Sequence, residues 1–184
     1  MTSPITHRTP GPTLAIDIGG GTQDILLWQP DVALENCVKM VLPSQTAVVA
    51  ARIRRCTLQG VPIFLTGNLM GGGACVWAIQ EHLRLGYPVY AEAEAALTIY
   101  DNLDRVRAMG VTLVEETPAD EVNTLVMTDV DLEALVRVLA VFEVEVPDSY
   151  AVAVQDHGFS PNGSNRLLDV IQDQDEIKPD PKLI

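Results

Sequence analysis

The stretch that decides the fold is Leu14-Ala15-Ile16-Asp17-Ile18-Gly19-Gly20-Gly21-Thr22-Gln23-Asp24-Ile25-Leu26-Leu27-Trp28. Two apolar runs flank three consecutive glycines, a pattern that is typical of a β-hairpin. Glycines in the turn leave backbone N–H groups open to an anion, because no Cβ stands in the way. The stretch therefore predicts a hairpin that receives a phosphate at its turn.

Two acidic residues bracket the turn. Asp17 lies at the end of the first apolar run, and Asp24 lies at the start of the second. A carboxylate at the end of an apolar strand is costly to bury unless it binds something. We therefore interpret Asp17 as a catalytic residue and as a ligand of Mg²⁺, or of a water bound to it. The residues predicted to contact the phosphate are Gly19, Gly20, Gly21, Thr22, Gln23 and Asp24.

The hairpin also has a purely structural interpretation, because glycine-rich turns between apolar strands are common. A tight turn needs only a single glycine or an Asn-Gly pair, so the run from Gly19 to Gly21 exceeds what folding requires. The excess favours ligand binding, and both interpretations stay open at this point.

A second glycine-rich loop follows the next predicted helix and strand. Residues Ser44–Gly60 read as a helix with Ser44 as its cap, and Val61–Leu65 reads as a short strand. The loop Thr66–Gly73 then opens another helix, whose first N–H groups are unpaired and whose dipole favours anions. Glycine that permits close helix–strand packing is the alternative. The candidate phosphate contacts in this loop are Gly71, Gly72 and Gly73.

The later part of the chain continues to alternate between predicted helices and strands. Asp129 and Asp131 precede a helix with apolar periodicity, and we interpret both as caps rather than as metal ligands. The apolar strand Ser149–Gln155 is followed by Asp156-His157-Gly158. A lone histidine at a strand end is more often structural than catalytic, so His157 is not predicted to be a general base.

Composition excludes several classes of function. The chain has 184 residues and a formal net charge of −13, and such a surface repels nucleic acid and anionic lipid. No apolar run reaches the roughly 18 residues that a membrane span needs. The polar residues 1–12 are expected to form a disordered arm and do not make a secretory signal. We therefore expect a cytoplasmic protein with no nucleic-acid or membrane partner.

The three cysteines, Cys37, Cys56 and Cys75, lie far apart in the sequence. An odd number of cysteines without a secretory signal indicates reduced, buried thiols. A radical-SAM enzyme would need three closely spaced cysteines to hold its iron–sulfur cluster. The sequence therefore argues against radical-SAM chemistry.

The motif Ile16–Asp24 resembles the first phosphate loop of the actin, Hsp70 and sugar-kinase superfamily, whose members close two RNase H-like domains over ATP and Mg²⁺. The chain resembles more closely a family known as domain of unknown function 1786, sometimes labelled pyruvate formate-lyase activating enzymes. This likeness runs from about Leu14 to Arg166 and covers the first half of the family's usual length. Its segments are the hairpin, Thr66–Gly73, Val89–Glu92 and Ala151–Pro161.

The resemblance implies an α/β fold, with an RNase H-like (actin-like ATPase) domain over residues 13–155. Its mixed sheet would carry helices on both faces, and residues 156–184 would be the start of a truncated second domain and an acidic tail. In the superfamily a second Asp-x-Gly phosphate loop opens the second domain. By this likeness Asp156 is a second metal ligand and catalytic residue, and His157 and Gly158 contact the ligand.

The implied ligand is ATP or another nucleotide with Mg²⁺, and three functions stay open. The chain is an Mg²⁺-dependent ATPase or kinase-like phosphotransferase, a module that binds phosphate compounds without catalysis, or a first-domain fragment with a structural or interaction role. Because most of the second domain is missing, we expect a homo-oligomer or a separate second-half chain to complete the cleft.

Overall fold

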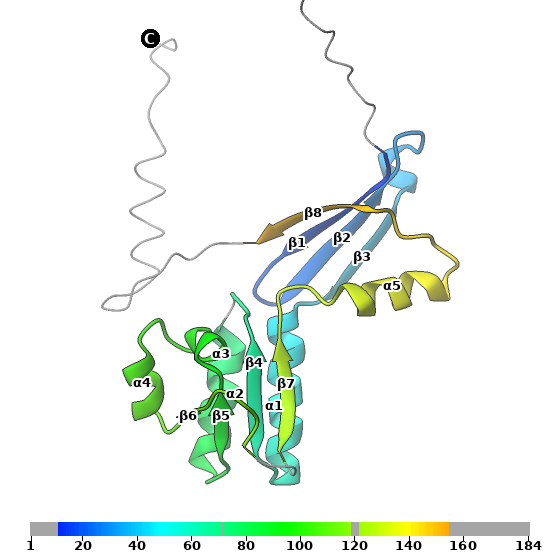
Figure 1. Ribbon diagram of the computed structural model, residues 1–184. Helices are drawn as coiled ribbons and strands as arrows, with labels where there is room; N and C mark the ends of the chain where they lie inside the picture. Colours follow the sequence, from blue (N-terminus) through cyan, green and yellow to red (C-terminus); the bar gives the residue numbers. More distant parts are fainter. Residues whose placement is uncertain (1–10, 71, 119–121, 155–184) are drawn as a thin grey trace, which may run out of the picture. The chain divides into compact units, whose positions relative to one another are not determined.

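The computed structural model describes residues 11–70, 72–118 and 122–154 (Figure 1). The chain divides into two compact units and passes between them after Ser44 and again after Asp129. The hairpin unit comprises the described residues up to Ser44 together with Val130–Val154, and the parallel-sheet unit comprises the described residues of Gln45–Asp129. Each unit has its own sheet and its own core, so each is described by itself.

The hairpin unit is built on a mixed sheet with the strand order β3-β2-β1-β8. Strands β1 and β2 are antiparallel, as are β2 and β3, whereas β8 is parallel to β1. The predicted hairpin is therefore confirmed. The bounds are β1 Thr13–Ile18, β2 Thr22–Trp28, the 3₁₀ helix η1 Leu34–Asn36, β3 Val38–Pro43, α5 Leu132–Val141 and β8 Ser149–Val154.

Apolar residues alternate along β1 and β2, and this period gives the sheet one buried face. Leu14 and Ile16 on that face join one hydrophobic cluster with Leu135 and Leu139 of α5. Helix α5 starts where the sequence predicts, because the Asp131 carboxylate accepts a hydrogen bond from the backbone N–H of Ala134 at 2.9 Å. The cap assigned to Asp131 is therefore confirmed, and α5 covers part of one side of the sheet.

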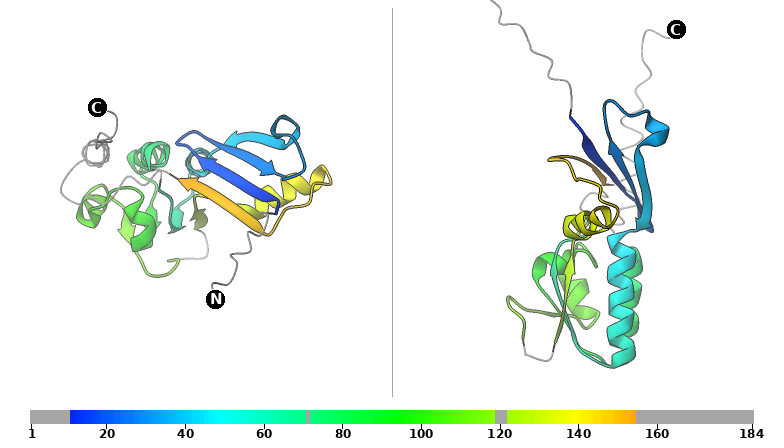
Figure 2. Two further views of the ribbon diagram at one scale, coloured as in Figure 1. Left: turned by 90° about the horizontal axis from the view of Figure 1, so that it is seen from above. Right: turned by 90° about the vertical axis from the view of Figure 1, so that its right-hand side faces the viewer.

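The parallel-sheet unit has the strand order β6-β5-β4-β7, and every neighbouring pair of strands is parallel. Helices α1 and α2 lie side by side on one face of this sheet (Figure 1 and Figure 2). The bounds are α1 Gln45–Gln59, β4 Ile63–Gly67, α2 Gly73–Arg84, β5 Val89–Ala91, α3 Ala93–Leu97, α4 Leu103–Ala108, β6 Thr112–Leu113 and β7 Asn123–Met127.

Helix α1 buries one face against the parallel sheet. Val49, Ile53 and Cys56 are buried in the same hydrophobic cluster as the apolar residues of β4. Gly60 follows the helix with a φ of 67°, a left-handed conformation that glycine adopts without strain and that commonly ends a helix. The predicted start and end of this helix are confirmed.

An α/β fold with a mixed sheet is confirmed, but the sequence did not predict a second, fully parallel sheet. The span 13–155, which the sequence analysis assigns to one first domain, contributes strands to both units; its assignment to an RNase H-like domain stays a prediction. The predicted arm and the start of a second domain lie largely outside the described residues. None of the helices in the described ranges has the length and apolar character needed to cross a bilayer.

His82 of α2 is a polar residue inside the core of the parallel-sheet unit. Its side chain is fully buried, and Nδ1 lies 2.9 Å from the hydroxyl of Thr57. That hydroxyl donates to the carbonyl of Ile53, so Nδ1–H of the imidazole is the donor to Thr57. Burial lowers the pKa of His82, because the charged ring would lose its hydration.

We expect this histidine to make the protein less stable in mild acid. The unfolded chain binds the proton more readily, since its histidine titrates near 6.5, so the free energy of unfolding falls as the pH drops below about 7. The free energy of unfolding falls by about 1.4 kcal/mol for each unit by which the pKa of His82 in the folded protein lies below that in the unfolded chain. Urea unfolding between pH 5.5 and 8 measures it, and His82→Leu should flatten the profile. An unchanged profile in that variant would contradict the assignment.

Candidate functional site

The turn between β1 and β2 is held from one side by Ser44. The N–H of Gly19 closes the turn onto the carbonyl of Thr22 at 2.9 Å. Buried Ser44 donates its N–H to the carbonyl of Gly21 at 3.0 Å and its hydroxyl to the carbonyl of Gly20 at 3.1 Å. Two carbonyl groups of the turn therefore face Ser44.

This anchoring leaves backbone donors on the open side of the turn. In a trans peptide the N–H points away from the C=O, so the N–H of Gly21 points away from the Ser44 hydroxyl that binds the carbonyl of Gly20. Within the described residues, neither Gly20 nor Gly21 uses its N–H in a hydrogen bond. All three turn glycines are exposed. Exposed, unpaired N–H groups in a turn are the groups from which proteins build anion-binding concavities, so the turn stays a candidate anion site.

Neither Gly20 nor Gly21 needs to be glycine for the fold. Neither has a φ in the left-handed region, and a Cβ built on either would meet no atom within 4 Å. Gly19 is more confined, because its Cβ would lie 3.1 Å from the carbonyl oxygen of Thr22. Neither a left-handed backbone nor lack of space therefore accounts for the second and third glycines, and close approach of a ligand stays a prediction.

Asp17 and Asp24 lie directly opposite each other in the β1–β2 register, and both are exposed. Like charges in opposite positions of an antiparallel pair destabilise the sheet. Gln23 lies on the other face, because side chains alternate along a strand. It is 4% exposed, and its Nε2 donates to the carbonyl of Pro43 at 2.9 Å. Of the residues predicted around the turn, the structure thus pairs the two carboxylates and separates Gln23 from them.

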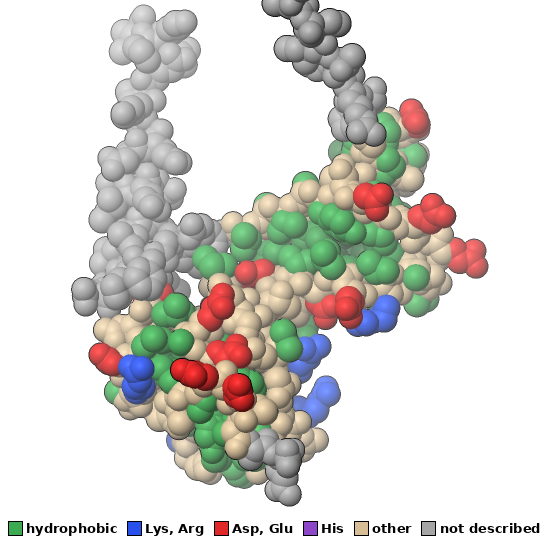
Figure 3. Space-filling view, viewed as in Figure 1, with side chains coloured by type: hydrophobic (Ala, Val, Ile, Leu, Met, Phe, Trp, Pro, Cys, Tyr) green, Lys and Arg blue, Asp and Glu red, His purple; other side chains and the backbone are tan. Residues whose placement is uncertain are grey.

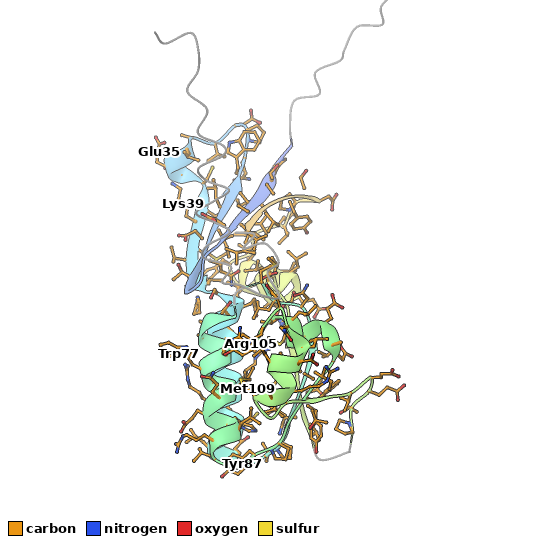
Figure 4. All side chains as sticks on the ribbon, turned by 90° about the vertical axis from the view of Figure 1, so that its left-hand side faces the viewer. Glu35, Lys39, Trp77, Tyr87, Arg105 and Met109 are labelled. Atoms are coloured by element: carbon orange, nitrogen blue, oxygen red, sulfur yellow. The ribbon has the colours of Figure 1, made fainter. Side chains whose placement is uncertain are left out.

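The face that carries the two carboxylates is hollowed into a groove of about 630 Å³. Apolar side chains of the sheet line most of it, and Lys39 projects from β3 (Figure 4). Pockets of this size accept small organic ligands. The lining residues are Ala15, Ile16, Asp17, Asp24, Ile25, Leu26, Leu34, Lys39, Met40, Val41, Ala151, Val152 and Ala153.

Strand β8 ends level with the end of β1, where the glycine turn begins. Val154 pairs with Ile18, the residue directly before the glycines. The chain therefore leaves the described part of the structure beside the turn. Asp156, His157 and Gly158 lie outside the described residues, so their roles stay predictions.

The second glycine-rich loop is occupied by the protein's own acceptors. The N–H of Gly67 donates to the Glu92 carboxylate at 3.4 Å, and the N–H of Met70 donates to the Asp129 carboxylate at 3.0 Å. Between them, the N–H of Asn68 is bonded to the carbonyl of Met127 at 2.9 Å. A phosphate would have to displace two carboxylates here, which argues against an anion site at the start of this loop.

Asp129 corrects one interpretation of the sequence. We interpreted it as a helix cap, but its carboxylate accepts a hydrogen bond from the N–H of Met70, which lies 59 residues earlier in the sequence. The Glu92 carboxylate has a similar role, because it accepts a hydrogen bond from the hydroxyl of Thr66 at 2.5 Å. Glu92 directly follows β5 and Asp129 lies two residues after β7, and the carboxyl ends of parallel strands meet at one edge of the sheet. That position was the signal for their role.

The remaining glycines of the loop divide into two kinds. Gly72 precedes α2, and a Cβ there would lie 2.3 Å from the carbonyl oxygen of Thr98, so close packing requires glycine. Gly73 opens α2 in free space, and no side chain caps that helix. Gly71 lies outside the described residues. Close packing therefore explains the glycine at position 72, while Gly73 stays a candidate contact for a phosphate.

The three cysteines are free and buried, as the sequence predicts. Burial raises the pKa of the Cys75 thiol to about 11, and its Sγ lies 3.3 Å from the carbonyl of Thr46. Such a thiol is protonated at neutral pH and is a poor ligand or nucleophile. Across the described ranges, no three His, Cys, Asp or Glu side chains gather into a metal-binding cluster.

The two glycine loops should respond differently to alanine. Gly67 has a φ of 83°, and its Cβ would lie 2.3 Å from the carbonyl oxygen of Met127, so Gly67→Ala should lower the free energy of unfolding by at least about 2 kcal/mol. Gly20→Ala should change it by less than about 0.5 kcal/mol. Urea unfolding of both variants measures the difference, and equal losses would show that the turn glycines are structural.

A family model described as "Putative pyruvate format-lyase activating enzyme (DUF1786)" matches residues 70–178. The matched span starts in the second glycine loop, includes α2 to β8 and continues past the last described residue. It does not include the hairpin. Comparisons with curated proteins and with solved structures gave no match. Since the matched span exceeds half of its 184 residues, the chain belongs to the DUF1786 family.

Proposed function

We propose that the protein binds a phosphate compound, with a nucleotide–Mg²⁺ complex as the expected ligand, at the turn between β1 and β2. The observation that carries the proposal is the exposed turn of Gly20 and Gly21, whose N–H donors are unpaired within the described residues and whose glycines the fold does not need. Ser44 fixes the direction of the Gly21 N–H before any ligand arrives, because it binds the carbonyl of Gly20 in the same peptide group. Such preorganisation lowers the cost of binding.

The carboxylate pair beside the turn supplies a reason for Mg²⁺. Mg²⁺ commonly binds one or two carboxylates together with phosphate oxygens and keeps several waters. An ion at Asp17 would relieve the repulsion that Asp24 causes from the directly opposite position. It would also neutralise the phosphate, which the formal net charge of −13 otherwise repels. The proposed metal site therefore has Asp17 as its main ligand.

The order and directions of the strands in the hairpin unit support an RNase H-like, actin-like assignment. Three antiparallel strands open the sheet, and a parallel strand joins β1 on its other side. The superfamily resemblance places a second phosphate loop after such a strand, at Asp156-His157-Gly158. Val154 is paired with Ile18, so the residues that precede this predicted loop end beside the glycine turn. On this proposal, Asp156 shares the metal or orients the attacking water.

With these parts, the reaction would be transfer of a phosphoryl group to water or to an acceptor. The backbone N–H groups of the turn would hold the phosphate, Asp17 would hold Mg²⁺, which supplies charge neutralisation when bound, and Asp156 would position the nucleophile, the division of work common in phosphoryl transfer. Binding without turnover is the second candidate. It is favoured by the observation that only Asp17 and Asp24 bring carboxylates to the described part of the site. The family's descriptive label is not proposed as the activity, since the three cysteines are buried singly.

Thermal unfolding with and without Mg²⁺-ATP or Mg²⁺-ADP tests the site. A ligand at 100 times its dissociation constant should add about 2.7 kcal/mol and raise the melting temperature clearly. The rise should disappear in Asp17→Asn and shrink strongly in Gly20→Ala/Gly21→Ala, because two methyl groups would crowd the approach to the turn. Release of phosphate from ATP by the wild-type chain, and not by Asp17→Asn, would separate turnover from binding.

Gly73→Ala is the matched control, because its added methyl group also meets open space but lies at the start of α2. It should keep the full thermal shift. If Gly73→Ala removes the shift while the double turn variant keeps it, the ligand binds at α2 and the hairpin proposal fails. If no variant or wild-type protein responds to either nucleotide, the proposed ligand class is wrong.

A further inference from the structure

Helix α5 covers one face of the hairpin sheet, and the groove lies on the other face. The helix packs against Leu14 and Ile16 of β1, whereas the side chain of Ala15, between them, faces the groove (Figure 2). Apolar side chains are exposed on the hairpin unit (Figure 3). Leu34 and Val41, which line the groove, are 56% and 66% exposed. Exposed apolar surface that is hollowed in this way is typical of a ligand-binding site.

The groove has a low floor and a higher wall. Three alanines make the floor, because Ala15 of β1 pairs with Ala151 of β8 and Asp17 pairs with Ala153. Paired residues of neighbouring strands face the same way, so these small side chains lie together. The wall consists of larger side chains from β2, η1 and β3, which are Leu26, Leu34, Lys39 and Val41. A floor of methyl groups beside such a wall fits a flat apolar group.

We propose that this groove receives an apolar or aromatic group of the phosphate compound that binds the glycine turn. This inference rests on the proposed function and narrows its ligand class. Asp17 and Asp24 line the end of the groove nearest the turn, and Ala15 lies two residues farther from the turn along β1. At about 3.3 Å per residue, Ala15 is about 7 Å from Asp17. A compound whose phosphate and metal lie at the turn and Asp17 would therefore extend its organic part over the alanines.

The chemistry of the lining favours an apolar group over a sugar. Among the described residues that line the groove, only Asp17, Asp24 and Lys39 have polar side chains. Strands β1 and β2 are each paired on both sides, so their backbone N–H and C=O groups are used within the sheet. The hydroxyl groups of a sugar would lose water there and find few new partners, which is costly. A hydrocarbon or aromatic ring would instead gain affinity from burial.

Titration calorimetry of the full chain with 1-naphthyl phosphate and with glycerol 3-phosphate, both in Mg²⁺, tests the groove. The two compounds share a phosphate monoester and differ in the organic group. We expect 1-naphthyl phosphate to bind at least about 10-fold more tightly, because the naphthyl ring would be buried. Ala151→Gln should remove this preference and leave the affinity for glycerol 3-phosphate unchanged, since it places a polar side chain at an exposed position of the floor.

Tyr150→Gln is the matched control and should keep the full preference. Tyr150 is 45% exposed and adjoins Ala151 in β8, but it pairs with Leu14 and lies on the opposite face. Equal affinity of the wild-type chain for the two compounds would overturn the inference and leave the phosphate site standing. A preference that survives in Ala151→Gln, or that both variants lose, would also overturn it. Asp17→Asn reports on the phosphate site separately, because it should weaken both compounds alike. If the wild-type chain binds neither compound, the proposed function fails and the inference fails with it.

Discussion

The hydrogen bonds from Ser44 hold the glycine turn in the orientation on which the candidate site depends. They engage the carbonyl groups of Gly20 and Gly21, so a single residue sets the direction of both peptide groups. Ser44 is buried, ends the hairpin unit and directly precedes α1. The turn is therefore hydrogen-bonded to the last residue of the hairpin unit before the chain enters α1. A flexible glycine turn would lose entropy on binding a phosphate, and this anchor removes part of that cost in advance.

The glycines of the chain separate into those that the fold requires and those that it does not. Gly67 needs its left-handed backbone, and Gly72 needs the space that a Cβ would fill. Neither reason applies to Gly20 or Gly21, although the sequence presents all of them in similar glycine-rich loops. A motif alone therefore ranks the two loops as equal candidates. Backbone angles and local space distinguish them and favour the hairpin.

Local patterns predicted the parts of the fold that are determined locally. Alternation and turn residues identified the β1–β2 hairpin, and capping chemistry identified the starts of α1 and α5. The separate parallel sheet was missed, because β4 pairs with β7 across about 60 residues and such pairing depends on packing rather than on neighbours in sequence. For the same reason Asp129 was mistaken for a cap, since its partner Met70 is distant in sequence. At the site, the register that opposes Asp17 to Asp24 follows from the length of the turn, and the buried side of Gln23 follows from β-strand alternation. The anchoring by Ser44 required the three-dimensional fold.

The two carboxylates and the glycine turn together explain how an acidic protein could hold an anion. Backbone N–H groups attract phosphate without adding a positive side chain, but they act only within hydrogen-bonding distance. The longer-range field of a chain with net charge −13 opposes the same ligand, and salt screens it only beyond about 10 Å. The proposed cation at Asp17 would change this balance, because it would convert the local repulsion between Asp17 and Asp24 into attraction for both the carboxylates and the phosphate. On that proposal, the energetic cost of placing like charges opposite each other would be recovered when metal and phosphate bind together.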